Sequence, residues 1–141
     1  MNILFFLTPK SEVIYIDANL SLQEAVTRIE QYSYTALPII NQQGEYVGTI
    51  TEGDLFWYYR SFITEETPVD SSIPIANVPR KQDYLPVRAT SDMEDLVSHA
   101  MNQNYVPVVD DDDNFIGIIT RRDLIQYCYN KLKSLSPEDD L

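Results

Sequence analysis

Two four-residue segments of the chain bring a hydroxyl group and a carboxylate close together. Thr120-Arg121-Arg122-Asp123 also carries two guanidinium groups, and Thr51-Glu52-Gly53-Asp54 has the same Thr and Asp 69 positions earlier. An ionised Asp can accept hydrogen bonds from two neighbouring hydroxyl groups, such as those of a ribose, and arginine binds phosphate. A helix that begins at such a segment adds free N–H groups and the positive end of its dipole. The pattern therefore favours binding of a sugar phosphate.

The same segments also have a purely structural interpretation. Thr-x-x-Asp is a capping box in which Asp stands in for Glu, so a capped helix alone explains both residue types. The location of positive charge favours a ligand site, because five of the ten Lys and Arg residues occupy two repeated places. They are Lys10, Arg80 and Lys81, which follow two prolines, and Arg121 and Arg122. In an acidic chain this clustering predicts local phosphate binding, with solvated arginines at a helix end as the alternative.

Both segments lie in a duplicated stretch of sequence. Residues 36–54 and 105–123 match without a gap, and their Pro, Gly, Thr and Asp each recur 69 positions later. Each copy reads as an apolar strand containing Pro, a polar turn, a second strand and the start of a helix. Duplication of this kind is typical of a repeated structural unit.

The rest of the chain supplies matching elements before each copy. The first copy follows a predicted strand at 13–16 and a predicted capped helix that begins at Leu22. The second copy follows a predicted strand at 84–87, limited by Pro86, and a predicted helix over 93–100. Each half is therefore β-α-β-β-α, and the fold class is α/β with an α+β-like mixture. The predicted domains are 3–63 and 73–134, with a polar linker at 64–72 and an acidic tail at 135–141.

Composition excludes several classes of function. The 141 residues carry a net charge of −12, and such a field repels nucleic acid and anionic lipid. The single cysteine, Cys128, cannot form an internal disulfide and is typical of a reducing cytoplasm. The apolar run at 3–7 is too short for a signal peptide, and no stretch approaches the roughly 20 apolar residues of a spanning helix. We expect a soluble cytoplasmic protein with no membrane or nucleic-acid partner.

The repeated unit resembles the CBS domain family. Two copies in register, each with an apolar-Pro-apolar strand and a Gly-apolar-apolar-Thr-x-x-Asp segment, are similar to a tandem CBS pair, the Bateman module, over residues 3–134. The resemblance implies two halves packed about a pseudo-twofold axis. It also implies two clefts that bind adenosyl ligands such as AMP, ATP, S-adenosylmethionine or cyclic di-AMP, and a tendency to form homodimers.

In the arrangement that this resemblance implies, each Thr-x-x-Asp faces the other half of the module. The predicted nucleotide site consists of Lys10, Val13, Ile14, Thr35, Ala36, Gly117, Thr120, Arg121, Arg122 and Asp123. The second cleft consists of Thr51, Asp54, Arg80, Lys81, Asn104 and Tyr105. There Glu52 and Gly53 replace the arginine pair, and a carboxylate beside a phosphate is unfavourable. We therefore expect the second cleft to bind nucleotide weakly or not at all.

The remaining polar and aromatic features predict neither catalysis nor a metal site. The acidic run 110–114 lacks the alternating ligands and the Gly of a calcium loop, and His99 and Cys128 form no nucleophile–base pair. The aromatic runs 56–59 and 127–129 cannot turn every ring toward one core. Their outward rings are therefore candidates for a dimer or partner face.

The sequence thus predicts a stand-alone regulatory module with no catalysis and no cofactor. An adenosyl ligand would change the shape or dynamics of an outer face that a protein partner reads, so the target would be regulated in trans. The alternative is a ligand-independent homodimeric scaffold in which the motifs act only as helix caps. An enzyme is disfavoured because no acid–base or nucleophilic constellation is present.

Overall fold

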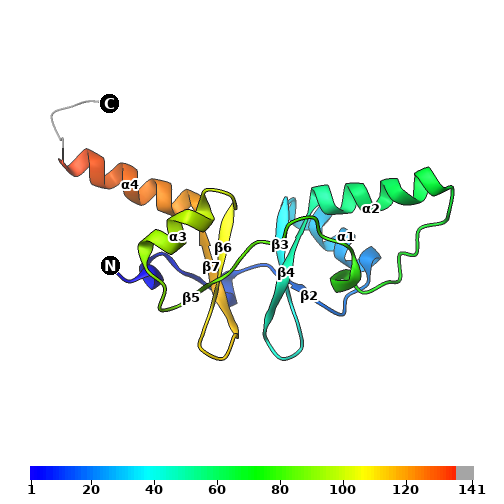
Figure 1. Ribbon diagram of the computed structural model, residues 1–141, viewed down its shortest axis with the longest axis horizontal. Helices are drawn as coiled ribbons and strands as arrows, with labels where there is room; N and C mark the ends of the chain where they lie inside the picture. Colours follow the sequence, from blue (N-terminus) through cyan, green and yellow to red (C-terminus); the bar gives the residue numbers. More distant parts are fainter. Residues whose placement is uncertain (136–141) are drawn as a thin grey trace. The chain divides into compact units, whose positions relative to one another are not determined.

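The computed structural model describes residues 1–135, and the chain divides into two compact units (Figure 1). Of the described residues, unit 1 comprises 1–13, 85–111 and 116–135, and unit 2 comprises 14–84 and 112–115. Each unit therefore contains the main elements of one repeat together with the segment that precedes the first strand of the other repeat. Residues 8–13 and 78–84 are called the two lead-in segments below.

Unit 2 is a three-stranded sheet covered by helices. Its strands β2 (Ile16–Asp17), β3 (Ala36–Ile40) and β4 (Tyr46–Thr51) lie in the order β2-β3-β4, with β2 parallel and β4 antiparallel to β3. The helices are α1 (Leu22–Tyr32) and α2 (Glu52–Glu65), and a 3-10 turn, η3 (Ile75–Asn77), follows.

Helix α1 is favoured by a cap at its first turn and by apolar residues along one face. The Ser21 hydroxyl accepts the Glu24 N–H at 3.2 Å and donates to the Glu24 carboxylate at 3.0 Å, so the predicted cap is present. Leu22, Ala25 and Ile29 follow at helical spacing and are buried in the core of unit 2. That core anchors β3 and β4, which lead into α2.

Unit 1 has the same plan with one additional strand. Its sheet has the order β1-β7-β6-β5, and β1 is antiparallel to β7, with Pro9 opposite Gly117. The strands are β1 (Thr8–Pro9), β5 (Val87–Arg88), β6 (Tyr105–Val109) and β7 (Phe115–Thr120), and the helices are α3 (Met93–Ala100) and α4 (Arg121–Leu135). Two 3-10 turns, η1 (Ile3–Phe6) and η2 (Lys10–Glu12), flank β1. Ile3 and Phe6 of η1 are buried in the core of this unit.

The predicted fold class and the two β-α-β-β-α repeats are confirmed, with small shifts at the first strand of each. Strand β2 begins at Ile16 rather than at 13, because the preceding residues form η2 and the Val13 N–H donates to the Lys10 carbonyl at 3.1 Å. Strand β5 begins directly after Pro86, the limit expected from proline. The predicted linker begins inside α2, and the predicted tail lies outside the described residues except for Leu135 at the end of α4. No helix within residues 1–135 combines the length and apolar character needed to cross a bilayer.

Candidate functional site

The start of α4 is tied to its surroundings by three hydrogen bonds. The Thr120 hydroxyl accepts the Asp123 N–H at 3.1 Å and caps the first turn. The Arg121 N–H donates to the Asn104 carbonyl at 2.9 Å, which joins this turn to the residue before β6. Arg121 Nε donates to the Ala100 carbonyl at 2.8 Å, at the end of α3. The Nε edge of the Arg121 guanidinium is therefore engaged in a hydrogen bond that joins α4 to α3.

Arg122 and Asp123, by contrast, keep their charged groups available. Both residues are exposed, and within residues 1–135 neither the guanidinium nor the carboxylate has a hydrogen-bond or ion-pair partner. A group that binds phosphate and a group that accepts from hydroxyls therefore lie side by side on the first turn of a helix.

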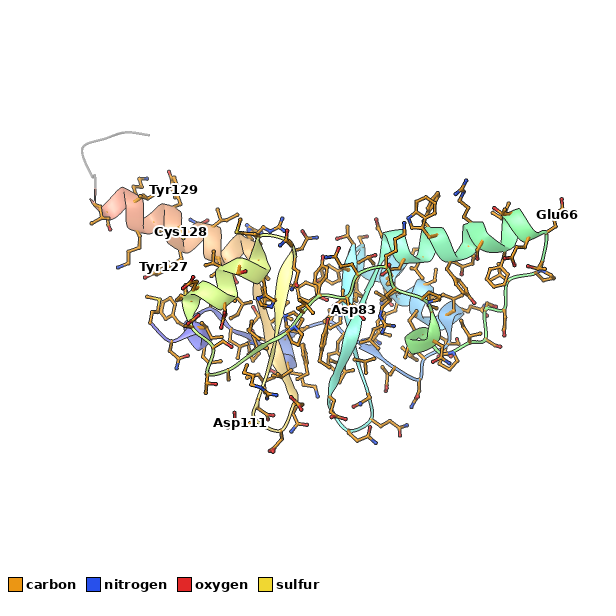
Figure 2. All side chains as sticks on the ribbon, in the orientation of Figure 1. Glu66, Asp83, Asp111, Tyr127, Cys128 and Tyr129 are labelled. Atoms are coloured by element: carbon orange, nitrogen blue, oxygen red, sulfur yellow. The ribbon has the colours of Figure 1, made fainter. Side chains whose placement is uncertain are left out.

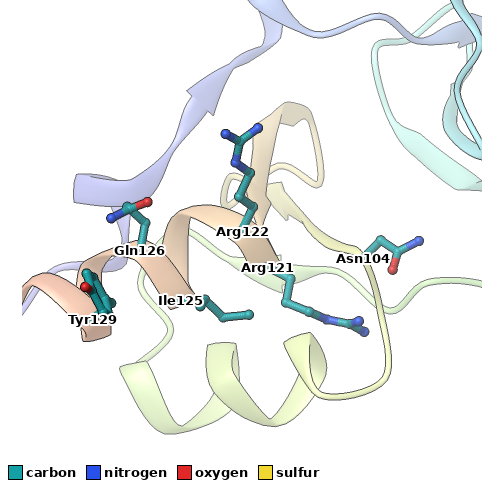
Figure 3. A pocket seen from close by; sticks show the side chains of 6 residues that line it. All are labelled: Asn104, Arg121, Arg122, Ile125, Gln126 and Tyr129. Atoms are coloured by element: carbon teal, nitrogen blue, oxygen red, sulfur yellow. The ribbon is translucent and has the colours of Figure 1, made fainter. Parts of the chain in front are cut away.

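An open pocket of about 590 Å³ lies beside this turn, and Figure 3 shows its side chains. Its lining consists of Asn104, Arg121, Arg122, Ile125, Gln126 and Tyr129. Sequence analysis missed the last three, although positions four and eight residues beyond Arg121 share its helical face. The volume is that of a small-molecule site. Its lining includes guanidinium groups, which suit a phosphate, and the ring of Tyr129, which suits a stacked base.

The equivalent start of α2 uses the same motif for its own structure. The Thr51 hydroxyl accepts the Asp54 N–H and the Asp54 carboxylate accepts the Thr51 N–H, each at 3.1 Å, which completes a capping box. The second Asp54 oxygen accepts the Lys81 N–H at 3.2 Å, and Asp54 is only 7% exposed. For this copy, the capping interpretation accounts for both residues.

The two cations of the second lead-in segment are engaged inside unit 2. Arg80 Nε donates to Asp83 Oδ1 at 2.7 Å, and Arg80 Nη1 donates to the Ala76 carbonyl at 3.0 Å. The Lys81 ammonium lies 4.6 Å from the centre of the Trp57 ring, within cation–π range. A smaller pocket of about 270 Å³ is lined by Asp54, Trp57, Tyr58, Ser61, Pro79, Arg80 and Lys81.

The two motif glycines make room for the lead-in segments. A Cβ at Gly48 would lie 2.5 Å from Asp83 Oδ1, and a Cβ at Gly117 would overlap the Thr8 carbonyl oxygen. Gly117 also has φ +154°, a conformation that side-chain-bearing residues rarely adopt. In unit 1 the space that glycine leaves is therefore taken by β1.

The predicted site residues are distributed over both units. Lys10, Val13, Asn104, Tyr105, Gly117 and residues 120–123 belong to unit 1, and Ile14, Thr35, Ala36, Thr51, Asp54, Arg80 and Lys81 belong to unit 2. Within unit 2 the Thr35 carbonyl accepts the Glu52 N–H at 3.0 Å, the counterpart of the Asn104–Arg121 bond in unit 1. Each motif thus contacts the residue before the Pro strand of its own repeat. The two predicted sets, which combine residues of both units, stay predictions.

A tyrosine hydroxyl joins β4 to the second lead-in segment. Tyr46 donates to the Tyr84 carbonyl at 2.7 Å, and its oxygen lies 2.8 Å from the Thr49 hydroxyl. Burial raises the pKa of Tyr46 above its ordinary value of 10.0, the Thr49 hydrogen bond lowers it, and the Asp83 charge raises it further. The phenol therefore stays protonated at neutral pH and remains a donor.

The other polar features singled out in the sequence lie away from these pockets or at their edges. His99 Nδ1 lies 2.7 Å from the Asp95 carbonyl on its own helix, and Cys128 is exposed and forms no disulfide. In the described part of the chain, no group of three or more His, Cys, Asp or Glu side chains could hold a metal ion.

The aromatic runs turn some rings inward and others outward. On α2, Phe56 and Trp57 are 61% and 45% exposed, whereas Tyr58 and Tyr59 pack against the core of unit 2. On α4, Tyr127 packs against the core of unit 1 and Tyr129 is exposed (Figure 2). The outward rings are therefore Phe56, Trp57 and Tyr129.

Two β-α-β-β-α units, each with a helix that begins at a Thr-x-x-Asp cap, define a tandem-repeat α/β module. The family described as "CBS domain" matches residues 6–61 and 75–130, and the chain belongs to this family. The two matched ranges contain both Thr-x-x-Asp segments and both Pro strands. The predicted tandem CBS pair is confirmed.

Curated relatives are much longer than this chain. It is 28% identical over 119 residues to an inosine-5'-monophosphate dehydrogenase of Methanocaldococcus jannaschii, covering 82% of this chain and 21% of the relative. It is 25% identical over 114 residues to a cystathionine beta-synthase of Dictyostelium discoideum, covering 81% and 22%. The chain therefore spans about a fifth of the length of these relatives.

Solved structures share the fold over nearly the whole chain. CbpB in complex with c-di-AMP has a TM-score of 0.83 at 18% identity, covering 99% of this chain and 91% of that one. A CBS domain protein from Streptococcus pneumoniae has a TM-score of 0.76 at 24% identity, covering 91% and 86%. CBSX2 in complex with AMP has a TM-score of 0.67 at 22% identity, covering 92% and 96%. These likenesses establish the shared fold.

Proposed function

We propose that this chain is a non-catalytic regulatory module that binds an adenine nucleotide at the start of α4. The observation that carries the proposal is the pair Arg122 and Asp123, which presents a guanidinium and a carboxylate without partners in the described structure. The guanidinium suits a phosphate, and the carboxylate suits the two hydroxyls of a ribose. Tyr129 in the adjoining pocket suits a stacked base.

Two structural neighbours support this choice of ligand class. CbpB has been solved with c-di-AMP and CBSX2 with AMP, and both share the tandem fold. We place cyclic di-AMP first among the candidates and keep AMP, ATP and S-adenosylmethionine as the others. In the cytoplasm, occupancy would change a face of the module that a protein target reads in trans, and the module would act as a homodimer.

A thermal-shift titration with these four ligands tests the proposal. A ligand that binds only the folded protein raises the Tm of that protein. At a ligand concentration of a hundred times the Kd, the free energy of unfolding rises by about 2.7 kcal/mol. Asp123→Asn and Arg122→Ala should each abolish the shift, because the first loses the charged acceptor and the second loses the phosphate donor. Asp111→Asn removes the same charge from an exposed turn and should leave the shift intact.

If none of the four ligands raises the Tm of the wild-type protein, the nucleotide proposal is wrong. The scaffold alternative would then be favoured, because the capping box at Thr51 and Asp54 shows that the motif can serve structure alone.

A further inference from the structure

Helix α2 leaves two large apolar side chains uncovered on one side. Phe56 is 61% exposed and Ile63 is 75% exposed, and the seven positions between them are about two turns of a helix. The Phe56 ring also meets the ring of Trp57 edge to face, with 5.2 Å between the ring centres. Apolar side chains that gather on an exposed helix face are typical of an interaction surface.

Helix α4 leaves apolar side chains uncovered at the equivalent positions. Ile125 and Leu132 follow the two apolar side chains of α2 by 69 positions, and they are 61% and 60% exposed. Ile125 also lines an open groove of about 440 Å³, together with Val97 of α3 and Met101 at the C-cap of that helix. A row of apolar side chains on another helix can pack into such a groove.

The two helices differ in charge. Helix α4 carries four basic residues and one acidic residue, a net charge of +3, although the whole chain has a net charge of −12. Helix α2 carries three acidic residues and one basic residue, a net charge of −2. Within residues 1–135, the exposed side chains of Glu52, Glu65, Lys131 and Lys133 form no ion pair. Each helix therefore has charges that a helix of the opposite sign can neutralise.

Charge also decides which helices of two copies fit together. Two α4 helices would bring two net charges of +3 together, and two α2 helices would bring two net charges of −2 together. Like charges across an interface disfavour association. Helix α2 of one copy and helix α4 of another have opposite net charges, exposed apolar side chains at matching positions and similar lengths of 14 and 15 residues.

We propose that α2 of one copy packs against α4 of a second copy, so that unlike helices hold the homodimer together. Phe56 and Ile63 contact Ile125 and Leu132 of the second copy, and the acidic residues of α2 lie beside the basic residues of α4. A twofold axis repeats this contact with the roles of the copies exchanged. The inference rests on the homodimer of the proposed function and adds the surfaces that form it.

Two double variants test this pairing. Phe56→Gln/Ile63→Gln, the α2 variant, and Ile125→Gln/Leu132→Gln, the α4 variant, remove the exposed apolar side chains of one helix each. Glutamine is a good helix former, so both helices are retained. Each variant alters both contacts of its own dimer. We therefore expect the Kd of dimerisation, measured by sedimentation equilibrium, to rise at least about a hundredfold for each variant.

A mixture of the two variants distinguishes unlike from like pairing. In a dimer of one α2 variant and one α4 variant, one contact joins the two altered helices and the other joins two intact helices. The mixture should therefore form heterodimers, detected by native mass spectrometry, at concentrations where each variant alone is monomeric. If like helices paired, every contact would include an altered helix, and no heterodimer would form.

Leu85→Gln is the control, because Leu85 is 60% exposed and lies outside both helices. Its Kd of dimerisation should match that of wild type. An equal loss in this control, a double variant that stays as dimeric as wild type, or a mixture without heterodimers overturns the pairing.

Circular dichroism checks that the variants fold. A double variant that unfolds is replaced by Ile63→Gln or Leu132→Gln, with an expected rise in Kd of about tenfold. Failure of either single variant to fold overturns the proposal, because a side chain that contacts only a second copy cannot be indispensable to the fold of one chain.

The pairing and the proposed function can fail separately. A wild-type protein that is monomeric at micromolar concentration removes the homodimer and the pairing together, and the nucleotide site is still tested by Asp123→Asn. A wild-type dimer whose variants form no heterodimer removes the pairing alone.

Discussion

The Asp54 carboxylate accepts two backbone N–H groups, from Thr51 and Lys81, whereas the Asp123 carboxylate accepts none within residues 1–135. The two residues occupy equivalent positions of the repeat and look alike in the sequence. Two contacts separate them: the Asp54 carboxylate accepts the Thr51 N–H of its own cap, and it accepts the N–H of Lys81, which lies 27 positions away in the second lead-in segment. The Thr-x-x-Asp pattern alone therefore predicts a helix cap in both repeats. It does not predict that the Asp123 carboxylate accepts no backbone N–H.

Tyr46 illustrates a residue whose role follows from burial rather than from any motif. Tyr46→Phe removes the hydrogen bonds to Thr49, which is 0% exposed, and to the Tyr84 carbonyl. We expect the free energy of unfolding at neutral pH to fall by about 1–2 kcal/mol, measured by urea denaturation. Tyr34→Phe, at an exposed position, should have little effect.

The same variant has a distinct pH dependence. Because the folded pKa of Tyr46 is raised, the native state holds this proton more tightly than the unfolded state does. The resulting stability is complete below about pH 10 and is lost as the pH rises above it. Wild type should therefore lose stability more steeply above pH 10 than Tyr46→Phe. Parallel curves would show that Tyr46 titrates normally in the folded protein.

At the scale of secondary-structure elements, apolar periodicity and caps predicted most of the fold. Strands β3, β4, β6 and β7 and helices α1 and α3 lie where alternation or 3-4 spacing placed them. The short pairing of β1 with β7 was not predicted, because a two-residue strand has no periodicity and its partner is more than a hundred positions away. The pocket-lining residues Ile125, Gln126 and Tyr129 were also missed, since only the placement of Asn104 beside α4 makes that helical face a pocket.

Helix α4 also carries an apolar face that fits the proposed homodimer. An open groove of about 440 Å³ is lined by Val97, Ala100, Met101, Arg121, Leu124, Ile125 and Cys128. Ile125 is 61% exposed and Met101 is 76% exposed. Burial of such side chains at an interface stabilises association. We expect Ile125→Glu to shift wild-type dimers to monomers in sedimentation equilibrium.

Gln126→Glu is the matched control, because it adds the same charge one position along the helix and does not line this groove. It should remain dimeric. A wild-type protein that is monomeric at micromolar concentration would contradict the proposed dimer.

At the scale of the whole molecule, the chain exchanges its lead-in segments. The first lead-in segment, residues 8–13, belongs with residues 1–7 to the unit built from the second repeat, and the second lead-in segment, residues 78–84, belongs to the unit built from the first. Gly48 and Gly117 both face these exchanged segments. The close approach of the segments is therefore enough to explain why each repeat has a glycine there, without any ligand. The duplication in the sequence predicts two units. It does not predict which lead-in segment packs in which unit.

Because of this exchange, the two units can complete their folding at different times during synthesis. Residues 14–84 of unit 2 leave the ribosome as one stretch, whereas β1 must wait for β7 before the sheet of unit 1 can close. Closing so long a loop is entropically costly and slow. In refolding followed by pulse-labelling hydrogen exchange, the amides of β3 and β4 should gain protection before those that join β1 to β7. Simultaneous protection would contradict this order. Until β7 emerges, the apolar side chains of Ile3 and Phe6 have no core to pack into, and a chaperone can bind them.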